Sequence, residues 1–174
     1  FEIDAIDLSV KRILSLDNHK EHRNAMYHSK VKPTWVTPSP SGKELYIAGN
    51  GSNKVLIIDV DEWKVKKTIK TGKGPYNIAA TTDGRHIITT LKNEGAVSIW
   101  SLDKGQQISK IKTSTNIPHG VVISPDNKYA FVSVEGVGGE AGKVDVISIE
   151  ELELVDSTEV GKQAGGIAFW KIAD

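Results

Sequence analysis

Cysteine is absent from the 174 residues of this chain. Its absence excludes disulfide bonds, thiolate nucleophiles and the cysteine ligands of zinc and iron–sulfur sites. Chains without cysteine occur in oxidising and in reducing compartments, so this absence leaves the compartment open.

Net charge of either sign is also missing. The chain has 22 Lys and Arg against 22 Asp and Glu, and its sequence pI is near 7.2. Nucleic-acid binding requires a basic field that replaces counterions on the phosphates, and attraction to an anionic membrane requires the same field. We therefore predict neither of these partners. No apolar run approaches the roughly 20 residues of a membrane-spanning helix, so no membrane span is predicted.

The length suits a single domain, and 39% apolar residues suffice for a core if repeated units stack on one another. The chain begins at Phe1 and enters strand-like sequence at once. We therefore expect any signal peptide of the parent protein to precede these residues.

One sequence pattern recurs through the chain. Its clearest copy is Ile117–Ser133, and diverged copies stand at Lys32–Ala48 and Gly74–Thr90, with a shorter echo at Gln163–Phe169. The landmark prolines of the three long copies are separated by 42 and then 43 residues: Pro33, Pro75 and Pro118. A period of this size indicates a β-propeller.

The repeats predict an all-β fold, a β-propeller built from four-stranded antiparallel blades. The predicted parts are the end of a blade at 1–16, an inter-blade insertion at 17–31, full blades at 32–72, 73–114 and 115–161, and the first strand of a closing blade at 162–174. Three full blades and two partial ones fall short of a ring. We expect the C-terminal part of a seven- or eight-bladed propeller; the alternative is a ring closed by a second copy of the chain.

The repeats resemble the YVTN-type β-propeller repeats of bacterial and archaeal surface-layer and periplasmic proteins. The resemblance is carried by the recurring Pro-x-x-(Val/Ile) segments, by Lys54-Val-Leu-Ile-Ile-Asp59 and by Thr68-Ile-Lys-Thr-Gly72. It implies an extracytoplasmic location, in the periplasm or on the cell surface. Similar repeats occur in the haem d1 domain of nitrite reductases, in nitrous oxide reductase and in lactonases, so the resemblance implies a ring and not one chemistry. WD40 repeats compete with this assignment through Ser98-Ile-Trp-Ser101, but no Gly-His opens the repeats.

Ligands of propellers commonly bind where the inner strands begin, at the mouth of the central channel. Superposing the repeats aligns Thr34, Tyr76, His119 and Gly165, and beside them Trp35, Asn77, Gly120 and Gly166. The predicted ligand-binding residues are Thr34, Trp35, Tyr76, Asn77 and His119. Trp35 and Tyr76 either stack on a ligand through their apolar faces or wedge adjacent inner strands together.

His119 has two interpretations. Imidazole serves as an axial ligand of haem, as a ligand of another metal and as a general base near neutral pH. The alternative is a structural histidine that hydrogen-bonds a loop carbonyl at the start of an inner strand.

Three further histidines lie in the insertion, at His19, His22 and His28. With Glu21 and Met26 they offer imidazole, carboxylate and thioether ligands, which suit zinc or copper. No strand or helix fixes their geometry and several positive charges flank them, so the alternative is a solvated polar loop.

For function, the leading hypothesis is a non-enzymatic binding or scaffold propeller. Its loop face would meet a protein, a polysaccharide or a small ligand outside the cytoplasm. The alternative is an oxidoreductase or electron-transfer propeller of the haem d1 or copper type that uses His119. Lactone hydrolysis ranks third, because the sequence does not identify the acids and bases that it needs. The sequence identifies no particular cofactor, and it leaves open whether the protein is an enzyme.

Overall fold

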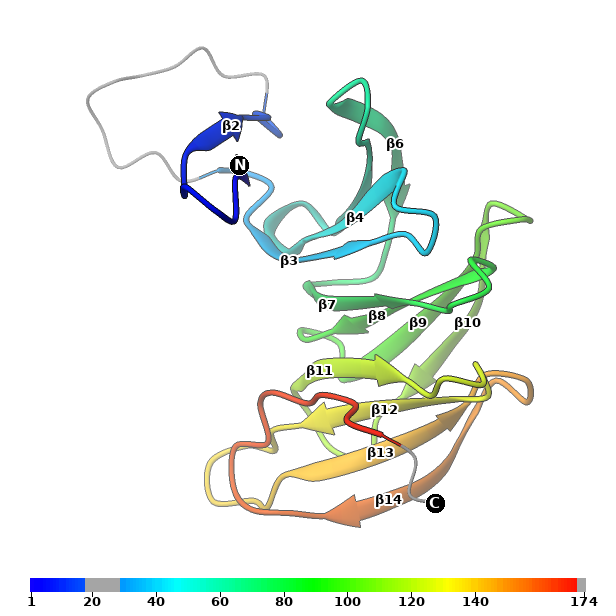
Figure 1. The fold of residues 1–174 in the computed structure, drawn as a ribbon. Helices are drawn as coiled ribbons and strands as arrows, with labels where there is room; N and C mark the ends of the chain where they lie inside the picture. Colours follow the sequence, from blue (N-terminus) through cyan, green and yellow to red (C-terminus); the bar gives the residue numbers. More distant parts are fainter. Residues whose placement is uncertain (18–28, 172–174) are drawn as a thin grey trace.

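The computed structural model describes residues 1–17 and 29–171. Three four-stranded antiparallel sheets follow one another in chain order (Figure 1). Blade 1 contains β3 (Pro33–Pro38), β4 (Glu44–Gly49), β5 (Lys54–Asp59) and β6 (Lys64–Lys70). Blade 2 contains β7 (Pro75–Ala80), β8 (His86–Leu91), β9 (Ala96–Ser101) and β10 (Gln106–Lys112). Blade 3 contains β11 (Pro118–Ile123), β12 (Tyr129–Val134), β13 (Lys143–Ser148) and β14 (Glu153–Glu159).

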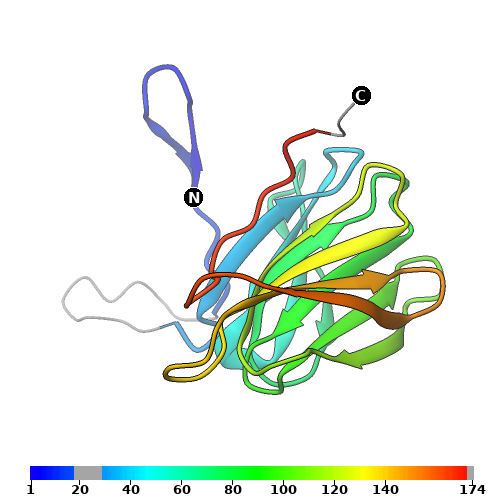
Figure 2. The same ribbon diagram turned by 90° about the horizontal axis from the view of Figure 1, so that it is seen from below.

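A short hairpin precedes blade 1 and extends away from the three sheets (Figure 2). It pairs β1 (Glu2–Ile3) with β2 (Val10–Arg12). Arg12 fastens it to blade 1, because Nη1 donates to the Val60 carbonyl at 2.9 Å and the guanidinium lies 4.3 Å from the Trp63 ring centroid. A single 3-10 turn, η1 (Asn50–Ser52), joins β4 to β5.

Each blade has a front face toward the next blade and a back face toward the preceding one. Side chains alternate between these faces along a strand, so neighbouring residues of β8 enter different cores. Ile87 packs with Tyr46 and Ile57 between blades 1 and 2, whereas Ile88 packs with Val121 and Val132 between blades 2 and 3. The apolar cores therefore lie between the blades, and burial of these faces stabilises the stack.

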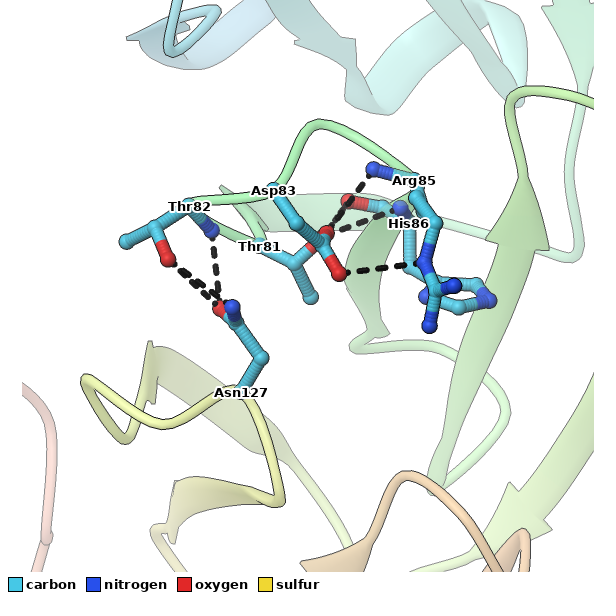
Figure 3. Close-up of polar contacts among 6 residues, drawn as sticks. All are labelled: Thr81, Thr82, Asp83, Arg85, His86 and Asn127. Atoms are coloured by element: carbon cyan, nitrogen blue, oxygen red, sulfur yellow. Dashed lines mark hydrogen bonds and ion pairs between the residues drawn. The ribbon is translucent and has the colours of Figure 1, made fainter.

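The turn between the first two strands has equivalent hydrogen bonds in each blade, with Ser41 of blade 1 in the place of the aspartates of blades 2 and 3. In blade 2 the Thr81 hydroxyl donates to Asp83 at 2.6 Å, and Asp83 accepts the Arg85 N–H at 3.0 Å (Figure 3). These two hydrogen bonds, the hydroxyl's first, lower the pKa of Asp83. Asn127, in the corresponding turn of blade 3, links the two blades by accepting the Thr82 N–H at 2.8 Å.

Neighbouring blades are also joined through buried hydroxyl groups. Thr90 in β8 accepts the Asn77 N–H of its own blade at 3.0 Å and donates to the His119 carbonyl of blade 3 at 2.9 Å. Ser133, the corresponding residue of β12, accepts the Gly120 N–H at 2.9 Å and donates to the Gly165 carbonyl at 2.5 Å. Each hydroxyl therefore fixes the register between one blade and the next inner strand.

Blade 1 makes the same connection with a different residue. The position of Thr90 is occupied by Ala48, which has no hydroxyl. Thr34 of β3 supplies one instead, and its Oγ1 donates to the Tyr76 carbonyl at 2.7 Å. All three hydroxyl bonds end on aligned carbonyls, those of Tyr76, His119 and Gly165.

The C-terminal segment was predicted to form a strand at 162–174. Residues 160–171 belong to no strand, although the Gly165 carbonyl takes the place of the aligned carbonyl of an inner strand. Among the described residues no second strand lies beside this segment to complete a ladder, which explains the absence of regular pairing. Residues 172–174 lie outside the described part of the chain.

The back face of blade 1 is partly uncovered. Val36 of β3 is 55% exposed, whereas the aligned Ile78 and Val121 are 1% and 4% exposed against the blade before them. Leu14, Leu16 and Val31 cover another part of this back face by packing against Leu56 and Ile58 of β5.

The hydroxyl bonds predict the effect of Thr90→Val. The substitution keeps the side-chain shape but leaves the Asn77 N–H and the His119 carbonyl without this buried partner. The free energy of unfolding should fall by about 1–3 kcal/mol, measured by denaturant unfolding. Thr68→Val on the exposed edge strand β6 is the matched control and should change it by less than about 0.5 kcal/mol. Equal effects of the two substitutions would contradict a structural role for the Thr90 hydroxyl.

Candidate functional site

Four side chains from two blades converge where the inner strands begin. We call Tyr76, Lys92, His119 and Glu135 the mouth cluster. Tyr76 and His119 are the second residues of β7 and β11, whereas Lys92 and Glu135 directly follow β8 and β12. Because β8 and β12 run antiparallel to the inner strands, their ends lie beside the inner-strand starts, as the pairs Pro75–Leu91 and Pro118–Val134 show.

Tyr76 contacts both another aromatic ring and a cation. Its ring centroid is 4.3 Å from that of His119, with the planes tilted by 52°. The Lys92 ammonium lies 4.5 Å from the Tyr76 centroid, a cation–π contact. The tyrosine ring therefore orders both a histidine and a lysine.

Glu135 connects the two basic groups. Its Oε1 lies 3.4 Å from the Lys92 Nζ and 3.3 Å from the His119 Nε2. The three side chains are only 22–28% exposed, so their charges are partly shielded from water. On its other side, the imidazole of His119 lies beside the backbone of Gly165.

The environment lowers the pKa of His119. Burial disfavours the imidazolium most strongly, and the Lys92 cation acts in the same direction. Glu135 and the backbone of Gly165 oppose both effects without cancelling them. The histidine is therefore mainly neutral at pH 7, beside one cation and one anion.

The other predicted ligand-binding residues have different environments. Thr34 uses its hydroxyl to bind the Tyr76 carbonyl, so its role is between blades. Trp35 is 48% exposed and presents a large apolar surface. Asn77 is only 5% exposed, and its Oδ1 has no hydrogen-bond partner in the described part of the chain. A buried amide oxygen of this kind can accept a hydrogen bond from a ligand or a water molecule.

The predicted metal site at His19, His22 and His28 lies outside the described residues. Within residues 1–17 and 29–171, no three side chains of His, Cys, Asp or Glu are grouped to hold a metal ion. No helix in this described part is long and apolar enough to cross a membrane.

From the sequence, Lys92 and Glu135 were not singled out as site residues. Neither belongs to an inner strand, where ligand-binding residues were sought. The available signal was their shared position, one residue beyond the second strand of each blade, aligned with Asn50 of blade 1. A comparison of this position across the three repeats would have shown the amide of Asn50, the cation of Lys92 and the anion of Glu135.

Two curated proteins share part of this sequence. Antigen Lp49 of Leptospira interrogans is 28% identical over 117 residues, which cover 54% of this chain and 26% of the antigen. The seven-bladed β-propeller protein Rv1057 of Mycobacterium tuberculosis is 23% identical over 133 residues, which cover 75% of this chain and 33% of that protein. The matched stretches thus span about a quarter to a third of these relatives. No protein-family model matches the chain.

Solved structures share the fold. A chain of hydrazine synthase from Kuenenia stuttgartiensis is 27% identical with a TM-score of 0.72, over 83% of this chain and 41% of that one. The WD40 repeats of RRP9 match at 12% identity with a TM-score of 0.68, over 80% of this chain and 42% of that one. The chain is a partial β-propeller. The predicted fold class is thereby confirmed, together with distant homology to seven-bladed propeller proteins and a structural likeness to WD40 repeats.

The charges around His119 predict how its titration responds to substitution. By NMR, its pKa should lie below the ordinary 6.5. Lys92→Gln removes a nearby cation and should raise the pKa, whereas Glu135→Gln removes an anion and should lower it further. Lys104→Gln, a lysine in the turn between β9 and β10, is the control and should leave it unchanged. Shifts in the same direction for both cluster variants would contradict the described geometry.

The same shift gives a pH dependence of stability. Because the folded pKa is depressed, the unfolded chain binds more protons between that pKa and 6.5. The contribution of His119 to stability is therefore present above pH 6.5 and is lost as the pH falls through the folded pKa. The variant His119→Gln should lack this component in unfolding measurements between pH 5 and 7, a range about the ordinary histidine pKa.

Proposed function

We propose that the protein is a non-enzymatic β-propeller binding module and that the mouth cluster contacts its ligand. The observation that carries this proposal is the convergence of Tyr76, Lys92, His119 and Glu135 from two blades. Together they offer an aromatic surface, a cation, an anion and a neutral imidazole within a few ångströms. Small numbers of polar groups beside apolar surface are typical of ligand sites.

The chemistry of the cluster favours a polar ligand with a flat apolar part. Trp35 adds exposed aromatic surface near the start of the neighbouring inner strand, and Asn77 adds an acceptor without a partner among the described residues. Aromatic faces beside paired charges suit a sugar ring, which presents an apolar face and hydroxyl groups. Among the protein, polysaccharide and small-molecule ligands considered from the sequence, a saccharide fits these residues best.

The contacts of His119 favour binding over catalysis. An axial metal ligand or a general base needs an accessible ring nitrogen with a lone pair. Here Nε2 faces Glu135 and the Nδ1 side faces Gly165, and the Lys92 cation close by disfavours a metal ion. The residues present therefore do not fit haem d1 or copper ligation by His119 as arranged here. The protein groups beside both ring nitrogens, Glu135 and the Gly165 backbone, also weigh against lactone hydrolysis with His119 as the base.

The proposal also includes the location of the protein and its role in a larger assembly. Resemblance to YVTN-type repeats supports an extracytoplasmic module, in the periplasm or at the cell surface. A similar propeller occurs in a chain of hydrazine synthase, so a role as one part of a larger assembly is compatible with binding. Fractionation of cells that express the full-length protein tests the location.

Ligand screening by NMR tests the mouth cluster directly. We expect oligosaccharides that bind to shift the resonances of Tyr76, His119 and Glu135, and Tyr76→Ala to weaken that binding about tenfold by loss of stacking. The matched control is Tyr129→Ala, which removes an exposed tyrosine from the start of β12, at the end of that strand remote from Glu135. The control should bind as the unsubstituted protein does.

Two results would contradict the proposal. One is a ligand whose binding shifts resonances elsewhere and leaves the cluster unchanged. The other is lactone turnover or stoichiometric haem that is lost in His119→Gln, which would assign a catalytic or cofactor role in place of simple binding.

A further inference from the structure

The zero net charge conceals a strong separation of charge along the chain. Residues 30–73 contain nine lysines and four acidic residues, whereas residues 115–161 contain two lysines and nine acidic residues. Blade 1 and its flanking segments are therefore basic, and blade 3 is acidic. A locally basic surface exists although the composition as a whole predicts none.

One cross-strand pair makes blade 1 unlike the other blades. Lys54 of β5 lies directly opposite Lys70 of β6 in the antiparallel register. Like charges in this arrangement are destabilising. The aligned pair in blade 3 is Lys143 opposite Glu159, and in blade 2 it is Ala96 opposite Lys112. Blade 1 thus carries an unfavourable pair where blade 3 has a favourable one.

Two more lysines lie around the same end of blade 1. Lys32 lies beside the β4–β5 turn, because its carbonyl accepts the Asn50 N–H at 3.1 Å. Lys73 lies in the link to blade 2, which Asn53 holds by accepting the Thr71 N–H at 3.0 Å and the Gly74 N–H at 2.9 Å. We call Lys32, Lys54, Lys70 and Lys73 the lysine cluster.

The ammonium groups of this cluster have few acidic neighbours within the described part of the chain. Glu94 is one, since its carboxylate accepts the Lys73 backbone N–H at 2.7 Å and lies close enough for the Lys73 charge to act on it. All four lysines are exposed, and no ion pair among the described residues involves any of them. The β4–β5 turn, Asn50–Asn53, contains no acid. Asp17 lies in the nearby N-terminal segment, and its Oδ2 accepts hydrogen bonds from the Ser29 hydroxyl and the Lys30 N–H.

Protection of a sheet edge does not account for the cluster. Lysines on edge strands discourage pairing with other chains, and this explains Lys64 and Lys66 of β6. Those two lysines have carboxylate partners, Glu62 and Glu44. Lys54 lies on β5, which is paired on both sides and has no free edge.

We propose that the lysine cluster binds a compact anion that carries several phosphate groups. A multivalent anion would convert the Lys54–Lys70 repulsion into attraction, and ammonium groups bind phosphate oxygens through strong charge-assisted hydrogen bonds. The anion is compact because the acidic blade 3 repels an extended polyanion laid across all three blades. This site uses none of the residues of the mouth cluster and does not depend on the function proposed for that cluster.

Calorimetric titration with tripolyphosphate tests the site, with citrate as the carboxylate comparison. We expect Lys54→Gln and Lys70→Gln each to weaken tripolyphosphate binding by about tenfold, the effect of losing one charged hydrogen bond. The matched control is Lys64→Gln, which removes the same charge from the opposite end of β6 and should change binding less than about twofold. Citrate should bind the unsubstituted protein more weakly than tripolyphosphate.

Thermal unfolding of the variants without ligand separates an effect on binding from an effect on folding. Without ligand, Lys54→Gln should unfold at the same or a higher temperature, because it removes a like-charge repulsion. Equal weakening by all three variants, or no binding to the unsubstituted protein, would overturn the proposal. Self-association that Lys54→Gln abolishes would also overturn it, by assigning the cluster to the acidic blade of a second copy.

Discussion

A buried hydroxyl that joins each blade to the next inner strand is the constraint on which the site depends. Thr90 binds Asn77 in its own blade and the His119 carbonyl in the next, and Ser133 does the same for Gly120 and Gly165. The apolar cores between blades are non-directional and tolerate small shifts along the strands, whereas a hydrogen bond between fixed partners does not. The hydroxyls therefore set the register that brings the aligned residues of successive inner strands together.

The side chains at the aligned inner-strand positions can differ because the inter-blade hydroxyl groups donate only to backbone carbonyls. They do differ: tyrosine in blade 2, histidine in blade 3 and glycine in the C-terminal segment. Tyr76 and His119 become neighbours through the common register, and Gly165 supplies only backbone next to the imidazole. The same logic applies at the outer strands, where one aligned cross-strand position holds Lys–Lys in blade 1 and Lys–Glu in blade 3.

The sequence predicts the repeated parts well, because spacing and turn chemistry are local. The proline period and the four-stranded blades both follow from short segments. The mouth cluster is harder to predict, since Lys92 and Glu135 become partners only after two blades are placed side by side. The lysine pair also required the register of β5 and β6, which contains an irregularity between Ile57 and Ile58. The lone C-terminal strand was predicted from its pattern, but a ladder needs a partner strand.

The central claim is that the inter-blade register places Tyr76 against His119, and a solution NOE measurement tests it most directly. The ring centroids are 4.3 Å apart, so strong NOEs should connect the aromatic protons of the two side chains in the unliganded protein. Detection of these NOEs would establish the contact from which the rest of the mouth cluster is built. Their absence, with both spin systems assigned and sharp, would show that the two inner strands do not have this register and would contradict the proposed site.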